Sequence, residues 1–190
     1  MKLGQDVAAA IRRELPLTPD MVALDYGCGS GLVTLGLQQF VGRITGADSS
    51  KGMLEVLTRK LEAGGITNVD TQLIDLERQQ RLAGSYDLIV SSMTMHHVED
   101  VAALVGSFVQ GLNPGGWLAL ADLETEDGGF HEDLTGVLHH GFDRDFFRSV
   151  FAKNDLTDIR IATAATIEKP DGSGGHRLYP VLLCLARKRP

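Results

Sequence analysis

Glycine recurs at alternate positions at the end of Val22–Gly31, a segment with the sequence VALDYGCGSG. Without a Cβ atom, the backbone at Gly27, Gly29 and Gly31 can turn sharply and approach a ligand closely. A helix that begins near Ser30 would then present free backbone N–H groups to an anionic group. A tight strand-to-helix turn that binds nothing is the alternative interpretation of so short a pattern.

Two carboxylates accompany these glycines. Asp25 lies just before the first glycine, at the end of an apolar run. Asp48 ends the next apolar run, roughly twenty residues further on, where an acid can accept hydrogen bonds from both ribose hydroxyls of a nucleoside. N-capping of the following helix is the alternative role of Asp48, although Ser49 or Ser50 would cap it equally well. Together with the glycines, Asp48 favours a nucleoside ligand.

The glycine spacing distinguishes between nucleoside ligands. A dinucleotide site has the pattern G-x-G-x-x-G, with a pyrophosphate over the helix start. Here the third glycine comes one residue early, and Leu32 and Val33 follow it. Asp25 would repel a pyrophosphate but attract the ammonium or sulfonium of an aminoacyl-type cofactor. We therefore expect such a cofactor, with a nucleotide-dependent oxidoreductase as the alternative.

Five of the six histidines fall in two segments, with His96 and His97 in the first and His131, His139 and His140 in the second. Imidazole titrates near physiological pH, which suits a general base. His96 and His97 are therefore candidate catalytic residues for a reaction in which the substrate must lose a proton. Capping or packing of the next helix is the alternative role of both.

Composition argues against several other functions. Cys28 and Cys184 form no CxxC pair, and the histidines have no acidic or cysteine partner at ligand spacing, so no metal is expected. The net charge of −7 disfavours nucleic acid. No apolar run is long enough to span a membrane, and the start of the chain predicts an amphipathic helix, so a cytoplasmic location is expected. The basic cluster Arg187–Arg189 is predicted to be a solvated tail.

Short β-branched or aromatic runs alternate with helical periodicity, which predicts a parallel sheet with helices on both faces. The last two predicted strands have no helix between them and should be antiparallel. We expect a single domain of residues 1–190 with strands at Val22–Tyr26, Arg43–Ala47, Val69–Ile74, Tyr86–Val90, Trp117–Ala121, Asp158–Ala165 and Tyr179–Ala186, and helices at Ser30–Phe40, Lys51–Ala63, Val101–Leu112 and Asp143–Phe151.

The segment Asp25–Gly31 resembles the first motif of the class I S-adenosylmethionine-dependent methyltransferases. Further similarities follow in the family's order along nearly the whole chain. They are Asp48 at the ribose-binding acid, Ser49 and Met53 at the adenosine pocket, Asp75 and Leu76 at the adenine, Tyr86–Ser92 at the fourth strand, and Leu112–Leu118 at the turn before the fifth.

This resemblance implies an α/β, Rossmann-like, doubly wound sheet of seven strands, mostly parallel with an antiparallel last strand and helices on both faces. It implies S-adenosylmethionine as the cofactor. Three of the matched residues have simpler roles open to them. Cys28 could be a small spacer between glycines, Met53 has the periodicity of helix core, and Asp75 could be a solvated residue at the end of a strand. The implied cofactor-binding residues are Asp25, Gly27, Cys28, Gly29, Ser30, Gly31, Asp48, Ser49, Met53, Asp75, Leu76 and Ser91.

The methyl acceptor is expected to be a small molecule. Few residues precede the first predicted strand and no large insertion follows the fifth, where related enzymes carry substrate-covering elements. Asp122–Gly141 is the candidate lid, with Gly128 and Gly129 as its hinge. A non-catalytic cofactor-binding module that acts through a protein partner is the alternative function. The sequence predicts neither the atom methylated nor the oligomeric state.

Overall fold

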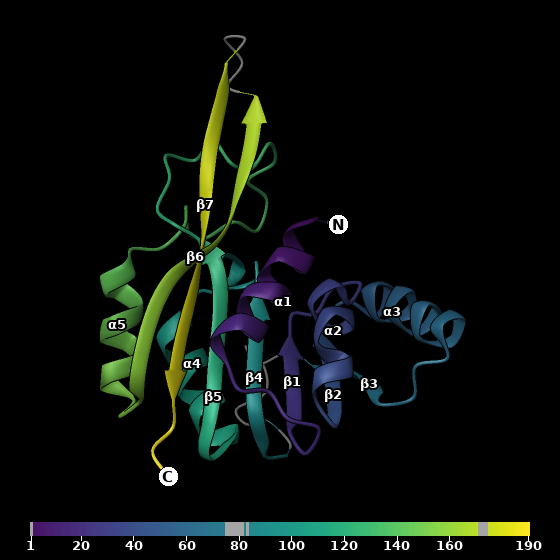
Figure 1. The fold of residues 1–190 in the computed structure, drawn as a ribbon. Coiled ribbons are helices and arrows are strands. Elements are labelled where there is room, and N and C mark those ends of the chain that lie inside the picture. Colours follow the sequence, from purple (N-terminus) through teal and green to yellow (C-terminus); the bar gives the residue numbers. More distant parts are fainter. Residues whose placement is uncertain (1, 75–81, 83, 171–174) are drawn as a thin grey trace.

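A computed structural model of the chain describes residues 2–74, 82, 84–170 and 175–190. Its strands form one sheet in the spatial order β3-β2-β1-β4-β5-β7-β6 (Figure 1). The strands from β3 to β5 are parallel, and β7 is antiparallel to both of its neighbours, as predicted. The strands are β1 (Val22–Tyr26), β2 (Arg43–Asp48), β3 (Val69–Leu73), β4 (Tyr86–Ser92), β5 (Leu112–Leu123), β6 (Thr157–Pro170) and β7 (His176–Arg187).

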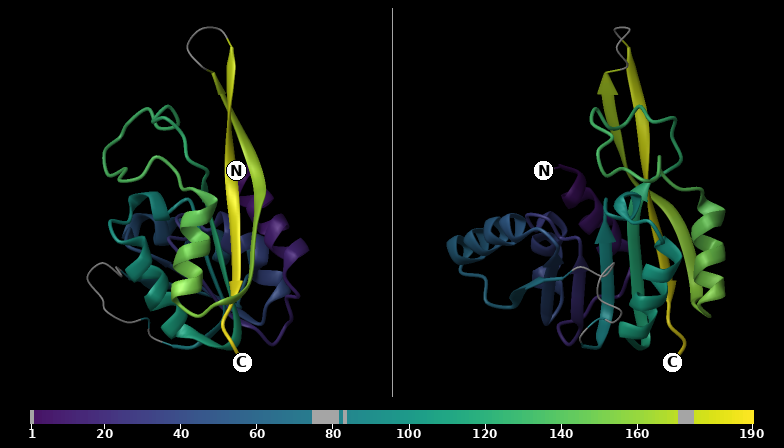
Figure 2. Two further views of the ribbon diagram at one scale, coloured as in Figure 1. Left: turned by 90° about the vertical axis from the view of Figure 1, so that its left-hand side faces the viewer. Right: turned by 180° about the vertical axis from the view of Figure 1, so that it is seen from behind.

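Helices cover both faces of the sheet (Figure 2). Successive strand residues point to opposite faces, so the strands feed two hydrophobic cores. In β4, Leu88 and Val90 pack with α1, α2 and α3, whereas Ile89 packs with α4 and α5. The predicted doubly wound arrangement is confirmed. The helices are α1 (Lys2–Glu14), α2 (Leu32–Leu37), α3 (Lys51–Gly64), α4 (Val101–Gly111) and α5 (Arg144–Lys153), with short 3₁₀ helices η1 (Gln38–Phe40) and η2 (Met95–His97).

The strand order reverses at β1, which has β2 on one side and β4 on the other. In an open parallel sheet, helices that cross on opposite faces leave a crevice outside the carboxyl ends of such a strand pair. The segment Gly27–Gly31 follows β1, and Ser92–Thr94 lies at the end of β4. Both therefore lie at the edge of the sheet where this fold binds ligands.

The helix predicted after the glycine loop begins later than expected. It was predicted from Ser30, but α2 begins at Leu32 and gives way to η1 at Gln38. Gly31 has a φ of 82°, a left-handed conformation that cannot continue a right-handed helix. The alternating glycines therefore lengthen the loop and shorten the helix.

Strand β5 begins five residues before the predicted Trp117, at Leu112. The segment Asn113–Gly116, predicted as a turn, lies inside the strand as an irregularity in its pairing with β4. Gly115 provides the required backbone freedom with a φ of 79°. The last two strands are also longer than predicted, because β6 and β7 continue past the sheet as a projecting hairpin (Figure 1).

The basic C-terminus is not the solvated tail that was predicted. The Arg187 guanidinium donates to the Gly115 carbonyl at 2.9 Å. The Lys188 ammonium donates to the carbonyls of Val109 and Leu112, at 2.7 and 2.6 Å. These carbonyls lie at the end of α4, where backbone acceptors lack helical partners and a cation is favourable. Lys188 therefore caps α4 from a distant part of the sequence.

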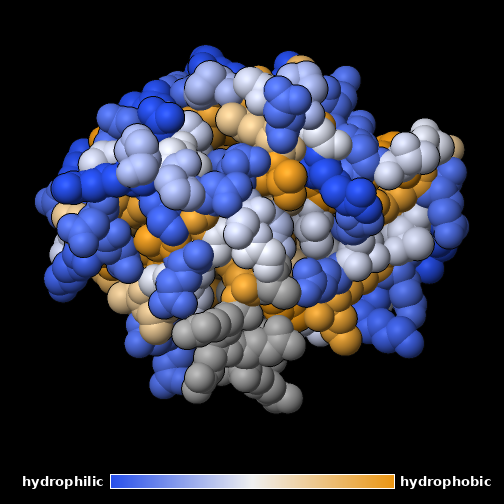
Figure 3. Space-filling model, turned by 90° about the horizontal axis from the view of Figure 1, so that it is seen from below, coloured by the Kyte–Doolittle hydropathy of each residue, from blue (hydrophilic) through white to orange (hydrophobic). Residues whose placement is uncertain are grey.

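The end of the sheet away from the glycine loop is mostly hydrophilic, with small hydrophobic areas between the polar side chains (Figure 3). No helix among the described residues is long and apolar enough to cross a membrane. At the other end, the segment between β5 and α5 lies beside the β6–β7 hairpin (Figure 2).

Replacing Lys188 by Met should lower the free energy of unfolding by about 1–2 kcal/mol, because two helix-end carbonyls lose a charged donor while the apolar stem is kept. Urea unfolding measures the change. The matched control is Arg189→Met, since the Arg189 side chain is exposed and should tolerate the change. Equal stability of both variants would show that Lys188 does not cap α4.

Candidate active site

Three glycines shape the loop after β1. Gly27, Gly29 and Gly31 have φ angles of 69°, 52° and 82°, a region in which other residues are strained. A Cβ atom would lie 2.3 Å from Thr94 Oγ1 at Gly27, and 2.3 Å from Leu57 Cδ1 at Gly31. At Gly29, by contrast, nothing lies within 4 Å of the Cβ position. The backbone at Gly29 therefore borders open space.

The backbone N–H groups of this loop are largely used within the protein. Those of Gly27 and Cys28 donate to one carbonyl at the end of β2, at 2.8 and 3.1 Å. The N–H of Gly31 donates to the Cys28 carbonyl at 2.8 Å, and that of Gly29 donates to the Asp48 carboxylate at 2.8 Å. These bonds leave few N–H groups of the loop itself for a pyrophosphate. The capture of an anionic group by N–H groups at the start of α2 stays a prediction.

Asp48 joins the glycine loop to the start of α3. Its Oδ2 accepts from the N–H of Gly29, and its Oδ1 accepts from the N–H of Ser50 at 2.8 Å. The N-cap of α3 is Ser50, whose hydroxyl accepts from the N–H of Met53 at 3.4 Å. Helix capping therefore does not account for Asp48. Its carboxylate is left at the rim of a cavity, with lone pairs still available to a ligand.

Two cavities, of about 290 and 460 Å³, lie over the loop and share Gly27, Gly29 and Met93 among their lining residues. The smaller cavity is lined by Asp25 and by Leu3 and Gly4 of α1. The larger one is lined by residues that follow β2 and β4, including Asp48, Ser49, Met53, Thr94 and His97. Together they extend from α1 across the glycine loop to α3.

Asp25 is buried at the inner end of the smaller cavity and is 1% exposed. Its Oδ2 accepts a hydrogen bond of 2.5 Å from the Thr34 hydroxyl. Burial raises the pKa of Asp25 to about 7, although the Thr34 hydroxyl partly opposes this. Ionisation of a buried carboxyl is costly when the group is alone, but it becomes favourable once a cationic group lies beside it.

Of the other predicted cofactor-binding residues, Ser49 and Met53 line the larger cavity. Met53 is 48% exposed, so its role as helix core is excluded. Cys28 and Ser30 line the smaller cavity. Burial raises the pKa of the Cys28 thiol, and the nearby charges of Asp25 and Asp48 raise it further, so the thiol is protonated and fits the role of a small spacer.

At the end of β4, the structure shifts the predicted site by one residue. Ser91 lines neither cavity, and its buried hydroxyl donates to the Tyr26 carbonyl at 2.8 Å. Ser92, Met93 and Thr94 line the cavities instead. Met93 has a φ of 55°, an uncommon backbone conformation that no pattern in the sequence predicts. The predicted residues Asp75 and Leu76 lie outside the described residues.

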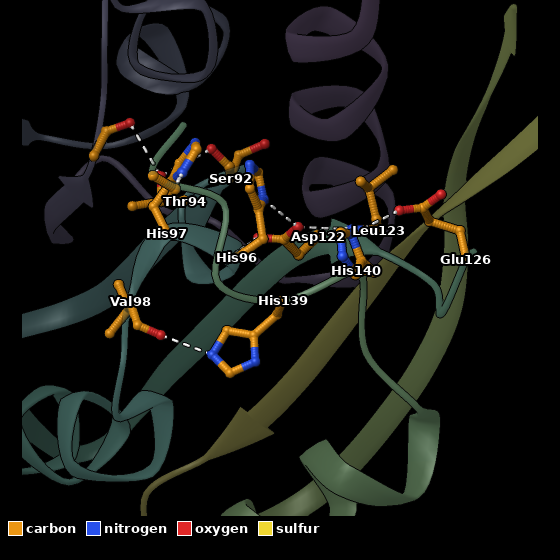
Figure 4. A network of polar contacts seen from close by, with 12 residues as sticks. Ser92, Thr94, His96, His97, Val98, Asp122, Leu123, Glu126, His139 and His140 are labelled. Carbon is orange, nitrogen blue, oxygen red and sulfur yellow. Dashed lines mark hydrogen bonds and ion pairs between the residues drawn. The ribbon is translucent and has the colours of Figure 1, made fainter. Parts of the chain in front are cut away.

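His96 is held by a buried carboxylate at the end of β5 (Figure 4). Its Nδ1 lies 2.7 Å from Asp122 Oδ1, and the two side chains are 2% and 0% exposed. Asp122 also accepts from the backbone N–H groups of His96 and Leu123, at 3.3 and 2.8 Å. A carboxylate at Nδ1 favours the tautomer whose other ring nitrogen, Nε2, can accept a proton. Asp122 was not predicted as a site residue, although it ends an apolar strand as Asp48 does.

His97 connects the larger cavity to the segment after β5. It lines that cavity, and its Nδ1 donates to the Gly136 carbonyl at 2.7 Å (Figure 4). The N–H groups of Leu138 and His139 donate to the His96 carbonyl, at 2.9 and 3.2 Å. The candidate lid, Asp122–Gly141, is therefore docked on η2 in this structure.

The lid also contacts the β6–β7 hairpin. The Phe130 ring packs edge-to-face on Tyr179 with centroids 5.3 Å apart, and the Lys169 ammonium lies 4.1 Å from the centre of the Phe130 ring. Gly128, predicted as a hinge residue, has a φ of 89°. Its role in lid movement stays a prediction.

Among the residues that the structure describes, no group of three or more His, Cys, Asp or Glu side chains is arranged to hold a metal.

The methyltransferase domain family matches residues 24–120 of the chain, which is just over half of it. An uncharacterized methyltransferase of Schizosaccharomyces pombe is 30% identical over 135 residues, which cover 64% of this chain and 48% of the relative. A ubiquinone biosynthesis O-methyltransferase of Nitrosococcus oceani is 38% identical over 95 residues, or 49% of this chain and 39% of the relative. The chain thus spans about half or less of the length of these relatives.

Solved structures support the same fold. Phosphoethanolamine N-methyltransferase 2 of Haemonchus contortus, in complex with S-adenosyl-L-methionine, matches 97% of this chain and 52% of its own, with a TM-score of 0.75 and a sequence identity of 15%. With the family match, the sheet order and the site described above, the chain belongs to the methyltransferase domain family, among the class I S-adenosylmethionine-dependent methyltransferases.

The raised pKa of Asp25 predicts a distinctive pH dependence of stability. Between the unfolded pKa near 3.8 and the folded pKa of about 7, the native state holds a proton that the unfolded state lacks. The free energy of unfolding should therefore fall as pH rises through this window, by up to about 4 kcal/mol for a shift of about three pKa units. Asp25→Asn should remove this component and be more stable than wild type at pH values above the window.

Urea unfolding across this pH range provides the test. Asp20→Asn is the matched control, because the Asp20 side chain is exposed. If Asp25→Asn kept the wild-type pH dependence, the carboxyl of Asp25 would not be protonated in the native state.

Proposed function

We propose that this protein transfers a methyl group from S-adenosylmethionine to a small-molecule acceptor, and that residues 1–190 act as one methyltransferase domain. The observation that carries the proposal is the pairing of Gly29, whose missing Cβ leaves open space, with the Asp48 carboxylate at the same cavity rim. The family match favours an enzyme over a non-catalytic binding module.

The residues present fit this cofactor. Few backbone N–H groups of the loop are free to bind a pyrophosphate. S-adenosylmethionine has no pyrophosphate, so it does not need them. Asp48 lines the larger cavity with Met53 and Ser49, so it would accept from the ribose hydroxyls while they line the adenosine side. Asp25 lines the smaller cavity and would bind the ammonium of the methionine part. When bound, the cofactor supplies a methyl group activated by positively charged sulfur.

On the acceptor side, His96 and His97 remain the candidate general bases. His96 is the stronger candidate for taking a proton, because Asp122 fixes its tautomer and would stabilise the imidazolium that forms. His97 is exposed and lines the larger cavity, so it is better placed to contact the ligands. The relative from Nitrosococcus oceani is named an O-methyltransferase, and methylation of a hydroxyl oxygen is consistent with a reaction that needs a base. Cytoplasmic location and the lack of a nucleic acid partner stay predictions.

Gly29→Ala and Gly65→Ala form a matched pair that tests the donor site. Both glycines have a left-handed φ, of 52° and 61°, and nothing lies within 4 Å of either Cβ position. Both variants should therefore lose a similar stability, about 1–2 kcal/mol. Only Gly29→Ala puts a methyl group into the proposed ligand space, so only it should lower the affinity for S-adenosylhomocysteine, by about tenfold or more in calorimetric titration. Equal affinity of the two variants would count against the site.

Asp48→Ala should weaken cofactor binding by about 2–5 kcal/mol, as expected for the loss of a charged hydrogen-bonding partner. Because Asp48 also holds the Gly29 N–H, Asp48→Asn is the second variant, which keeps one acceptor oxygen for the loop. It should fold like wild type by thermal denaturation and still lose most of the affinity in calorimetry. Asp70→Asn, which alters a surface ion pair with Arg43, is the control. Wild-type affinity in both Asp48 variants would refute the ribose assignment.

A further inference from the structure

Three imidazole rings lie together beside the larger cavity. The centroid of the His96 ring is 4.1 Å from that of His97 and 4.9 Å from that of His131. His97 and His131 are 6.3 Å apart, and His97 lines the cavity. His96 and His97 come from η2, whereas His131 comes from the candidate lid. In its position on η2, the candidate lid thus places a third histidine beside the candidate base.

His131 has a ring nitrogen without a partner. Its Nε2 is buried and makes no hydrogen bond to the part of the chain that the structure describes. Such an atom is costly, because buried polar groups are almost always hydrogen-bonded. The nearby His96, His97 and His139 each use one ring nitrogen in a bond to the protein. An unpaired nitrogen 4.9 Å, ring to ring, from the candidate base is a place for a polar atom of a ligand.

We propose that His96 and His131 together bind the methyl acceptor, and that the acceptor carries an acidic hydroxyl, as in a phenol or an enol. This inference rests on the proposed methyl transfer. The hydroxyl donates to Nε2 of His96, and a second polar atom of the acceptor pairs with Nε2 of His131. Because His96 is 2% exposed, the acceptor reaches it when the lid moves away from η2.

The charges around these rings favour a developing negative charge. Burial lowers the pKa of His131, and so do the positive charges of His96, His97 and Lys169, which together outweigh the opposite effect of Glu126. The ammonium of Lys169, which lowers the pKa of His131, would also repel an ammonium acceptor. Of the nearby carboxylates, Asp122 accepts three protein hydrogen bonds. Oε2 of Glu126 accepts from the Phe130 N–H, whereas its Oε1 lies 3.5 Å from Nδ1 of His140 and makes no hydrogen bond to the described residues.

Other acceptor classes use these groups less well. A carboxylate is already ionised at neutral pH, so it would need no base. A thiol forms only weak hydrogen bonds and would pair poorly with Nε2 of His96. A phenol, with a pKa of about 10 as in tyrosine, is close enough to imidazole at about 6.5 for general-base catalysis.

In the reaction, the acceptor O–H proton passes to Nε2 of His96 while an oxygen lone pair forms a bond to the methyl carbon. The carbon–sulfur bond of the donor breaks, and its electron pair stays on sulfur. The products are the methyl ether, S-adenosylhomocysteine and the His96 imidazolium, which the Asp122 carboxylate stabilises. Asp122 acts through His96 and is a positioning residue.

Four probes with one ring and different reacting groups test this inference: para-nitrophenol, para-nitrobenzyl alcohol, para-nitrobenzylamine and para-nitrobenzoate. Each is titrated calorimetrically into the protein saturated with S-adenosylhomocysteine, so that no turnover occurs. We expect para-nitrophenol to bind about tenfold or more tightly than the others, since it alone offers the acidic hydroxyl. Para-nitrophenol is partly ionised in water near neutral pH, so an increase of its phenolate absorbance on binding at constant pH reports proton loss in the site.

His131→Phe keeps the ring packing on Phe130 but removes the nitrogens, and should weaken para-nitrophenol binding about tenfold. His131→Gln keeps a polar end and should lose less, which also guards against a folding defect. His176→Gln, at an exposed histidine of the hairpin, is the control and should bind as wild type does.

Equal binding of the four probes, or wild-type binding of para-nitrophenol by both His131 variants, would overturn the inference and leave the proposed function standing. Failure of S-adenosylhomocysteine to bind at all would overturn the proposed function and the inference with it.

Discussion

The end of β2 holds the loop after β1 in place, and the site depends on this contact. The Ala47 carbonyl accepts the N–H groups of Gly27 and Cys28, and the Asp48 carboxylate accepts that of Gly29. These bonds impose left-handed backbone conformations that only glycine adopts without strain. They also turn the open side of Gly29 toward the cavities. The parallel pairing of β1 with β2 is therefore both the centre of the fold and the support of the donor site.

Ionisable groups are buried around this contact at a cost to stability. Asp25 sits beneath the loop, where burial opposes its ionisation, and Asp122 lies at the end of β5 with almost no exposure. A fold selected only for stability would place apolar residues at such positions. That these carboxyls lie beside the cavity and beside His96 is consistent with binding and catalysis, since functional sites commonly break the rules that stabilise the rest of a fold.

The glycine loop and Asp48, the proposed donor half of the site, could be predicted to lie together because their sequence signals are local. Glycines at fixed spacing and an acid at the end of the next strand determine the loop whatever the rest of the chain does. The acceptor half could not be predicted in this way. His131 approaches His96 only because the segment between β5 and α5 folds back on η2. Met93 and Thr94 line the cavities where the backbone turns after β4, with Met93 in a left-handed conformation. Lys188 was misjudged for the same reason, because its acceptors in α4 are distant in sequence.

The most direct measurement is a calorimetric comparison of S-adenosylhomocysteine with NADH on the same protein sample. A loop with few free N–H groups and a carboxylate at each cavity predicts saturable binding of S-adenosylhomocysteine and no binding of NADH. Saturable binding of NADH without binding of S-adenosylhomocysteine would contradict the account at its centre.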